Sequence, residues 1–231
     1  MYAKLLPAFA CCVGAAVANS ANLFVSSYAG NITTLSLSLL KGGSYHLVET
    51  SANAGCSPNP SWLTLDYKNR TLYCLDEGLT VPNGSLSSYA INNDGSLEQV
   101  QKASTISGPV SGAIYKNPGG QRAIALAHYT GSDLSSWKLV GKENGPFSFV
   151  ENIPFTIPHP GPNPARQDAP HEHEAIIDPT GQYLLMPDLG ADLVRIFSFN
   201  NDATLNALQP LNVVPGSGPR HAVFYLSLIH I

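Results

Sequence analysis

An internal repeat is the feature that most limits how this chain can fold. Two apolar runs end at Asp66 and Asp178, and each is followed by turn residues and a second apolar run. These second runs end at Asp76 and Asp188, and a glycine follows each of those two residues by two positions. Each aspartate thus has a counterpart 112 positions further along the chain. Self-similarity of this kind predicts several copies of one small structural unit.

Further copies of the unit are present. A third copy at residues 123–139 lies between the first two, so the 112 residues hold two periods of about 56. An earlier copy starts near residue 23, and a fifth begins at residue 218. The runs are four to seven residues long and are bounded by Gly, Pro, Asn and Asp, which is typical of short antiparallel strands. The strands expected from them are 23–27, 33–39, 62–65, 71–75, 86–91, 123–127, 134–140, 175–177, 183–186 and 193–199.

Repeated units of short strands predict an all-β fold, a β-propeller with one unit per blade. A blade buries its faces only against its neighbours, so the blades must stack to form a core. Residues 19–225 hold about four blades and the start of a fifth. We expect the chain to stop before such a propeller closes, and therefore to be inactive as it stands. Residues 226–231 do not continue the repeat and are predicted to be a non-native tail, with a genuine last strand as the alternative.

The first residues indicate export. Lys4 precedes an apolar stretch that runs to residue 18, and Ala16-Val17-Ala18 has the small-x-small form of a cleavage site. We therefore predict a signal peptide at residues 1–18 and a secreted, extracellular protein. An uncleaved membrane anchor is the alternative, although the stretch is short for a span. No later segment has the pattern of a transmembrane helix, and we expect no membrane contact after cleavage.

The mature chain keeps two cysteines, Cys56 and Cys74. Two cysteines in an oxidising compartment predict a disulfide, and two buried free thiols are the alternative. Three N-glycosylation acceptor sequences begin at Asn31, Asn69 and Asn83, and these fit a secretory route.

The composition excludes some classes of function. The net charge is −4 and charged residues make up only 12% of the chain, so no basic surface for nucleic acid or anionic lipid is indicated. A glycine-rich phosphate loop and a serine nucleophile elbow are both absent from the sequence.

Candidate catalytic residues lie just before two of the apolar inner strands. They are His171, His173 and Glu174 in one blade, and Arg220 and His221 in the next. A propeller directs these loops toward its central channel. Histidine exchanges protons near neutral pH, and arginine holds carboxylates or stabilises an oxyanion. We predict that His171 or His173 is the acid/base and Glu174 its orienter or the partner acid, with Arg220 and His221 binding the substrate. A solvated loop without function is the alternative.

Two further residues occupy equivalent blade positions, at the end of the second strand. His128 and Asp188 are candidates for substrate binding, with a turn-stabilising hydrogen bond as the alternative. Alternating His and Glu can also ligate zinc, but the His-Glu-x-x-His spacing is absent, and we predict no metal. The six prolines of the loop at 154–170 predict a stiff, extended insertion that can wall the channel mouth.

Three segments of the sequence resemble a known family. PHEHE at 170–174, DPTG at 178–181 and PDLGADLV at 187–194 together resemble the central signature of the lactonase family of seven-bladed propellers. GPRH at 218–221 resembles that family's next-blade motif, and NAGC at 53–56 with PSWL at 60–63 is similar to its secreted fungal members. The family includes 6-phosphogluconolactonases and carboxy-cis,cis-muconate cyclases. The resemblance implies a seven-bladed propeller, a site in the central channel and no cofactor.

Three functions remain open at this point. The first is hydrolysis of a lactone that bears a sugar or a carboxylate, as in the 6-phosphogluconolactonases. The second is the lactone-forming isomerisation of a carboxy-cis,cis-muconate. The third is a non-catalytic secreted propeller that binds a carbohydrate, a metabolite or a protein. The first two predict a small acidic lactone or carboxylate as the partner. The export signal departs from the cytosolic sugar-phosphate lactonases and leaves the physiological substrate open.

Overall fold

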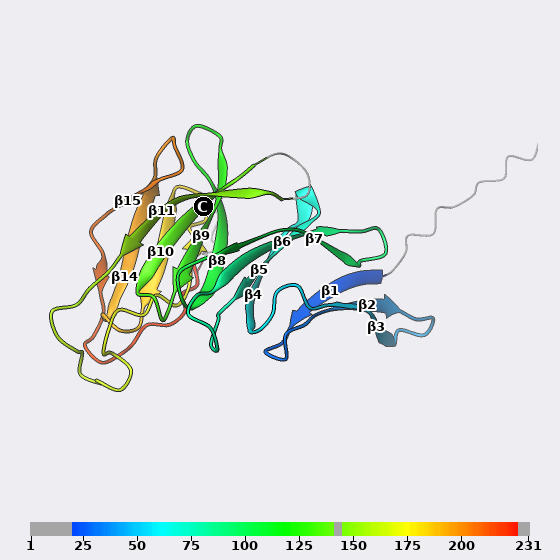
Figure 1. The fold of residues 1–231 in the computed structure, drawn as a ribbon, viewed down its shortest axis with the longest axis horizontal. Helices are drawn as coiled ribbons and strands as arrows, with labels where there is room; N and C mark the ends of the chain where they lie inside the picture. The colour runs from blue at the N-terminus through cyan, green and yellow to red at the C-terminus, as the bar shows by residue number, and fades with distance from the viewer. Residues whose placement is uncertain (1–19, 141–144, 226–231) are drawn as a thin grey trace, which may run out of the picture.

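The structure is a computed structural model that describes residues 20–140 and 145–225. The predicted signal peptide at 1–18 and the predicted tail at 226–231 lie outside the described residues. The described strands form four antiparallel sheets that follow one another in chain order, from blue to orange in Figure 1. Within each sheet the neighbours are consecutive along the chain, apart from one short added strand. This arrangement is that of successive propeller blades, as the repeat predicts.

Each blade is one sheet that contains three to five of the described strands. Blade 1 contains β1 (Ser20–Ser26), β2 (Ile32–Leu39) and β3 (Tyr45–Asn53). Blade 2 contains β4 (Pro60–Asp66), the 3-10 helix η1 (Tyr67–Asn69), β5 (Thr71–Asp76), β6 (Ser85–Ile91) and β7 (Leu97–Ser104). Blade 3 contains β8 (Pro109–Lys116), β9 (Arg122–His128), β10 (Asp133–Leu139) and β11 (Phe147–Pro154). Blade 4 contains β12 (Ile176–Ile177), β13 (Tyr183–Asp188), β14 (Leu193–Phe199), β15 (Leu205–Ala207) and β16 (Leu211–Asn212), the last pairing with β14.

The blade spacing is less regular than the predicted period of 56. Asp76, His128 and Asp188 end the equivalent strands β5, β9 and β13. The first two of these residues are 52 positions apart and the last two are 60 apart. The longer interval contains the proline-rich segment between β11 and β12, so the predicted period is the mean of two unequal ones.

The core lies between neighbouring blades, and β9 shows how one strand serves two interfaces. Ile124 and Leu126 pack with Tyr73 and Leu75 of blade 2. The alternating residues of β9 are the alanines at 123, 125 and 127, which pack against blade 4 with Leu184 and its neighbours. All of these side chains are buried. Because successive side chains of a strand point to opposite faces, a strand buried on both faces reads as one continuous apolar run.

Residues 218–225 start a further blade without forming a regular strand. The Ala222 N–H donates to Glu174 Oε2 at 2.6 Å, and the Ala175 N–H donates in the same way to Ser111 Oγ at 3.1 Å. The chain near Ala222 therefore packs beside the first strand of blade 4 in the same way that the start of blade 4 packs beside the first strand of blade 3. This placement agrees with the predicted start of a fifth unit.

The predicted disulfide between Cys56 and Cys74 is confirmed. Both cysteines are fully buried and belong to the core between blades 1 and 2. The glycosylation acceptors Asn31 and Asn83 are exposed, whereas Asn69 is half-buried and its Nδ2 donates to Asp66 Oδ2 at 2.8 Å. Glycosylation and secretion stay predictions. Within the described ranges, no helix is long and apolar enough to cross a membrane.

Candidate functional site

The site is built on a turn that blades 2, 3 and 4 repeat. The residue ending the second strand faces the start of the inner strand: Asp76 pairs with Pro60, and Asp188 bridges Glu172. The Asp188 Oδ1 atom accepts three backbone N–H groups, from His171, Gly190 and Ala191, at 2.9 to 3.0 Å. A carboxylate that accepts three backbone donors fixes the loop that carries the candidate histidines.

His128 and Asp188 are themselves fully buried. The His128 ring contacts Ile106 O at 3.2 Å through Nδ1 and Ser135 Oγ at 2.8 Å through Nε2. Burial lowers the pKa of His128 to about 4, so the ring is neutral near pH 7. Because neither side chain is exposed, this geometry favours the turn-stabilising alternative over substrate binding for both residues.

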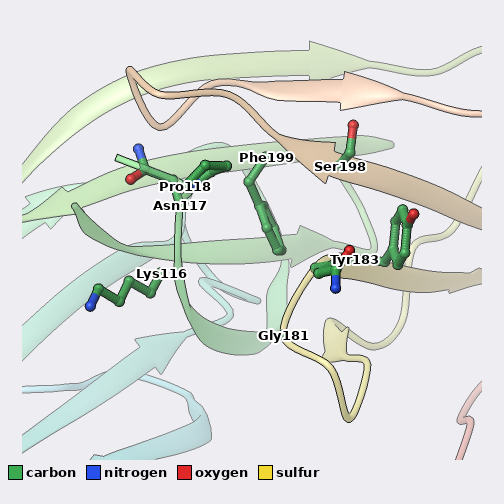
Figure 2. A pocket seen from close by; sticks show the side chains of 8 residues that line it. Lys116, Asn117, Pro118, Gly181, Tyr183, Ser198 and Phe199 are labelled. Atoms are coloured by element: carbon green, nitrogen blue, oxygen red, sulfur yellow. The ribbon is translucent and has the colours of Figure 1, made fainter. Parts of the chain in front are cut away.

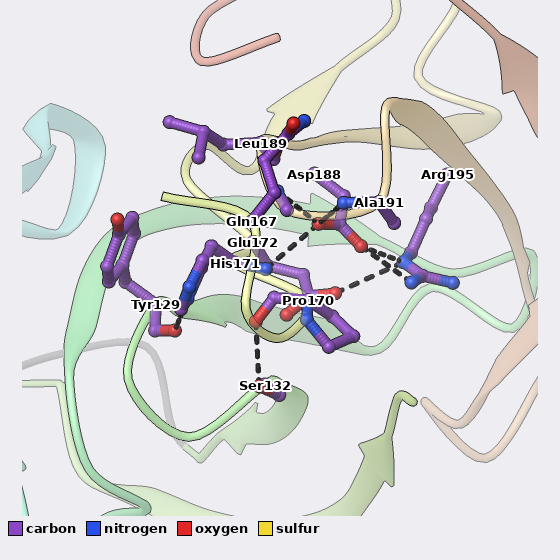
Figure 3. A network of polar contacts seen from close by, with 11 residues as sticks. Tyr129, Ser132, Gln167, Pro170, His171, Glu172, Asp188, Leu189, Ala191 and Arg195 are labelled. Atoms are coloured by element: carbon purple, nitrogen blue, oxygen red, sulfur yellow. Dashed lines mark hydrogen bonds and ion pairs between the residues drawn. The ribbon is translucent and has the colours of Figure 1, made fainter. Parts of the chain in front are cut away.

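A buried charge network lies behind the same turn (Figure 3). Arg195 donates to Asp188 Oδ2 at 2.6 Å through Nη2 and to Glu172 Oε1 at 3.1 Å through Nε. Both carboxyl side chains are fully buried, and the guanidinium also lies 3.9 Å from the centre of the Phe155 ring. One guanidinium balances one negative charge, so the network is neutral when one of the two carboxyl groups keeps its proton. Burial, and then the charge of Asp188, raise the pKa of Glu172 to about 9.

This raised pKa predicts how stability depends on pH. The unfolded carboxyl binds its proton only below about pH 4.3, whereas the folded one keeps it up to about pH 9. The folded state therefore holds more protons between these values, and the free energy of unfolding falls as the pH rises. When the pH is raised from 5 to 8, we expect the free energy of unfolding of the wild type to fall by at least about 1 kcal/mol more than that of Glu172→Gln. Urea unfolding of both proteins at both pH values measures this difference, and equal falls in the two proteins would contradict the prediction.

The His171 ring is contacted through both nitrogens and one face, and Figure 3 shows its contact with Tyr129. Its Nδ1 lies 2.8 Å from Tyr129 O, its Nε2 lies 3.0 Å from Asp168 Oδ1, and its ring stacks on Tyr129 with centroids 4.2 Å apart. A carbonyl and a carboxylate are both acceptors, so both contacts are satisfied when both ring nitrogens carry hydrogen. The hydrogen bond from His171 lowers the pKa of the Asp168 carboxyl. Both ring nitrogens of His171 therefore face acceptor oxygens of the protein.

His173 is the partner of Arg220. The Arg220 Nε donates to His173 Nε2 at 2.7 Å, which places the ring hydrogen on Nδ1. Burial, followed by the charges of Arg220 and His221, lowers the pKa of His173 to about 4. The Nδ1 atom is buried and has no hydrogen-bond partner among the described residues. His173 is therefore neutral and orients the guanidinium rather than offering a free lone pair.

Glu174 and His221 complete what we call the inner-strand cluster, which comprises His173, Glu174, Arg220 and His221. Glu174 Oε2 accepts the Ala222 N–H, and its Oε1 lies 3.8 Å from His221 Nδ1. The His221 ring meets His173 edge-on with centroids 4.9 Å apart, and its side chain is 55% exposed. The sequence pointed to Glu174 as the orienter of His171 or His173, and the structure instead places it beside His221.

Several residues of this region were missed by the sequence analysis. Tyr129 contacts both His171 and His173. The Tyr28 hydroxyl donates to Glu77 Oε2 at 2.5 Å, and this bond is the main cause that raises the pKa of Tyr28 to about 12. The repeat could have indicated Glu77 and Tyr129, because these residues directly follow the equivalent residues Asp76 and His128.

Metal-ligand groups and pockets complete the description. In the part of the chain that the structure describes, no group of three or more His, Cys, Asp or Glu side chains is placed to hold a metal ion. Figure 2 shows a pocket of about 420 Å³ between blades 3 and 4, lined by Lys116, Tyr183 and Phe199 among others. The predicted site residues do not line it. It lies at the β8–β9 turn, the opposite end of the blades from the inner-strand cluster.

The fold and site define a class: a repeated-blade propeller with histidine, glutamate and arginine where inner strands start. The model of the family described as "Lactonase, 7-bladed beta-propeller" matches residues 22–228, and the chain belongs to this family. The resemblance and the fold prediction are thereby confirmed.

Curated relatives carry matching names. The "Probable 6-phosphogluconolactonase" of Arthroderma benhamiae is 36% identical over 202 residues, covering 87% of this chain and 48% of that protein. The 6-phosphogluconolactonase of Formosa agariphila is 29% identical over 171 residues, covering 72% of this chain and 47% of that protein. The chain thus spans about half the length of these two relatives.

Solved structures agree. The periplasmic gluconolactonase PpgL of Pseudomonas aeruginosa superimposes with a TM-score of 0.68 and 25% identity, covering 89% of this chain and 58% of that one. A Bacteroides fragilis protein superimposes with a TM-score of 0.75 at 24% identity, covering 91% of this chain and 60% of that one, a likeness that shows the fold alone.

Proposed function

We propose that the protein hydrolyses a small acidic lactone at the inner-strand cluster. The observation that carries this proposal is the meeting of Arg220, His221 and Glu174 from two successive blades. The names of the relatives support the lactone as the class of substrate. Because whole relatives are about twice as long, we assign the activity to the full-length protein, in which further blades add to the channel wall.

The chemistry follows from three parts. Water attacks the lactone carbonyl carbon and gives a proton to a base. The carbonyl oxygen becomes an oxyanion, which the exposed Arg220 guanidinium stabilises by charge-assisted hydrogen bonds. The bond between the carbonyl carbon and the ring oxygen then breaks, and the ring oxygen takes up a proton to become the free hydroxyl of the hydroxy acid.

The geometry favours His221 as the residue that accepts and returns the proton. Both ring nitrogens of His171 face acceptors, and the Nε2 of His173 accepts from Arg220. His221 keeps an exposed ring, and Glu174 stands 3.8 Å from its Nδ1. Such distances shorten in many enzymes when substrate binds. We therefore assign the acid/base role to His221 with Glu174 as its orienter, in place of the His171 or His173 expected from the sequence.

Arg220→Ala tests the oxyanion part. We expect the variant to lower kcat on a δ-lactone by about 10²-fold, because the group that stabilises the developing charge is lost. Initial rates by pH-stat titration measure this. Arg70→Ala serves as the control, because Arg70 only donates to the Ile91 carbonyl in blade 2 and its loss leaves the rate unchanged. A rate in Arg220→Ala equal to wild type would overturn the assignment.

Assays of the wild-type protein with a carboxy-cis,cis-muconate and with carbohydrate ligands distinguish two other functions. Formation of a lactone from 3-carboxy-cis,cis-muconate, without hydrolysis of sugar lactones, would favour the cyclase alternative. Turnover of neither, with binding of a carbohydrate or metabolite, would favour the non-catalytic propeller. Secretion is part of the proposal, and it is supported by the export pattern at residues 1–18 and the buried disulfide.

A further inference from the structure

Glu77 occupies a position that the blades repeat. It follows Asp76 at the end of the second strand of blade 2, as Tyr129 follows His128 in blade 3. The Tyr129 ring lies edge-on to the ring of His173, with centroids 5.7 Å apart. Because equivalent residues of successive blades lie at the same end of a propeller, Glu77 belongs to the end that carries the inner-strand cluster.

Backbone hydrogen bonds connect Glu77 to Tyr129 through a single residue. The Glu77 carbonyl accepts the Gly108 N–H at 3.2 Å, and the Gly108 carbonyl accepts the Tyr129 N–H at 2.7 Å. Tyr129 contacts His173 in turn, and His173 Nε2 accepts from Arg220 Nε at 2.7 Å. An unbroken series of contacts therefore runs from Glu77 to the inner-strand cluster.

The backbone around Glu77 is fixed on both sides. The Glu77 N–H donates to Asn59 O at 3.0 Å. The preceding Asp76 Oδ1 accepts the N–H groups of Asn59 and Gly78 at 2.8 and 3.1 Å. Gly78 has a φ of +70°, and a Cβ there would clash with Asn83 O, so the turn is closely packed. The Glu77 side chain thus leaves a rigid turn, which suits a group that must meet a ligand in one geometry.

Only one oxygen of the half-buried Glu77 carboxylate is used within the described residues. Its Oε2 accepts the Tyr28 hydroxyl, whereas its Oε1 accepts no hydrogen bond and no basic side chain pairs with it there. The hydrogen bond to Glu77 is the main cause that raises the pKa of Tyr28 to about 12, and the charge of Arg220 opposes this effect. The hydroxyl that holds Glu77 therefore lies within the field of Arg220, and Oε1 is available to a ligand.

We propose that Glu77 is a specificity residue, whose Oε1 accepts a hydrogen bond from a hydroxyl group of the lactone while the carbonyl lies at Arg220 and His221. The inference rests on the proposed function and adds a residue of blade 2 to that site. A carboxylate only accepts hydrogen bonds, so it binds a hydroxyl group and repels an anionic group at the same place. A site built to bind a hydroxyl group discriminates strongly against an analogue that lacks it.

The test compares a lactone that carries ring hydroxyl groups, glucono-δ-lactone, with one that carries none, δ-valerolactone. Rates of the full-length wild type, Glu77→Gln and Glu98→Gln are measured by pH-stat. Glu98 is exposed in β7 of the same blade, and its substitution makes the same change in charge on the outermost strand. We expect the ratio of kcat/KM for glucono-δ-lactone to that for δ-valerolactone to fall about tenfold in Glu77→Gln, as weakening of one charge-assisted hydrogen bond predicts. Glu98→Gln keeps the wild-type ratio.

Tyr28→Phe separates substrate recognition from a structural role. This variant breaks the hydrogen bond between blades 1 and 2 but keeps the Glu77 carboxylate. We expect it to keep most of the wild-type preference for glucono-δ-lactone. An equal loss of preference in Tyr28→Phe and Glu77→Gln would show that the contact between the blades matters and would overturn the assignment. Equal lowering of kcat/KM for both lactones in Glu77→Gln, or no change for either, would also overturn it.

Binding of the two hydrolysis products gives a readout without turnover. Isothermal titration calorimetry measures gluconate and 5-hydroxypentanoate on the wild type and on Glu77→Gln. Weaker binding of gluconate alone in Glu77→Gln, in a protein that hydrolyses neither lactone, would support the role of Glu77 and overturn the proposed function. Hydrolysis of both lactones with an unchanged ratio in Glu77→Gln would overturn the role of Glu77 and leave the proposed function intact.

Discussion

His221→Asn is expected to lower kcat for lactone hydrolysis by about 10² to 10⁴-fold, the range that general acid/base groups contribute. Asparagine keeps a polar group of similar reach but cannot exchange a proton near neutral pH. The His221 side chain is 55% exposed, and its contacts in the described structure are to the His173 ring and to Glu174, so the fold is expected to be unchanged. Initial rates at saturating substrate, together with the urea midpoint of each variant, measure both parts of this expectation.

His173→Asn is the matched comparison, because it makes the same substitution next to the same arginine. We expect a smaller loss of kcat in His173→Asn than in His221→Asn, because the variant disturbs only the orientation of the Arg220 guanidinium and keeps the base. Glu174→Gln is expected to lower kcat less than His221→Asn and to change the pH profile, since it removes the charge beside the ring. A larger loss in His173→Asn than in His221→Asn would return the acid/base role to His173, one of the two histidines predicted from the sequence.

Arg195→Met is expected to destabilise the fold by about 3 to 5 kcal/mol, the usual effect of removing one partner from a buried ionic network. The substitution leaves Glu172 and Asp188 buried without their cation, and the Phe155 ring also loses its contact. Glu172→Gln in the same protein is expected to recover part of the loss, because it removes one of the two buried carboxyl groups. Urea unfolding of the single and double variants measures both effects.

Arg122→Met supplies the control for this prediction. Arg122 pairs with Asp66 across blades 3 and 2, but its side chain is 30% exposed against 15% for Arg195. The Asp66 carboxylate is also buried, but it keeps a donor in Asn69 Nδ2 when the arginine is removed, so a smaller loss than in Arg195→Met is expected. Equal losses of unfolding free energy in Arg195→Met and Arg122→Met would contradict the idea that burial of the blade 4 network determines its contribution to stability.

How far the fold could be predicted depended on burial. The strands β5 and β9 are buried on both faces and β13 is buried over most of its length, and all three read as continuous apolar runs, so they were predicted within about two residues. The outermost strands β3 and β7 are largely exposed, and their polar residues gave no such signal. The unequal spacing of the blades was likewise hidden, because the period was taken as half of the 112-residue offset between the copies in blades 2 and 4.

The candidate site was predicted in its residue types but not in its partners. Glu174 meets Ala222 and His221 from the next blade, 48 and 47 positions away, and no local pattern indicates that pairing. His128 and Asp188 share a repeat position, but only the structure shows that both are buried. Arg195 could have been found: a lone arginine inside an apolar strand requires a buried partner.

We propose that the full-length propeller hydrolyses lactones at the inner-strand cluster. The direct measurement is the rate of hydrolysis of 6-phosphoglucono-1,5-lactone by the full-length protein, by pH-stat against the uncatalysed rate in the same buffer. We predict clear acceleration, and a return to the uncatalysed rate in an Arg220→Ala, His221→Asn double variant that keeps the wild-type urea midpoint. A folded wild-type protein that leaves the lactone hydrolysing at the uncatalysed rate would contradict it.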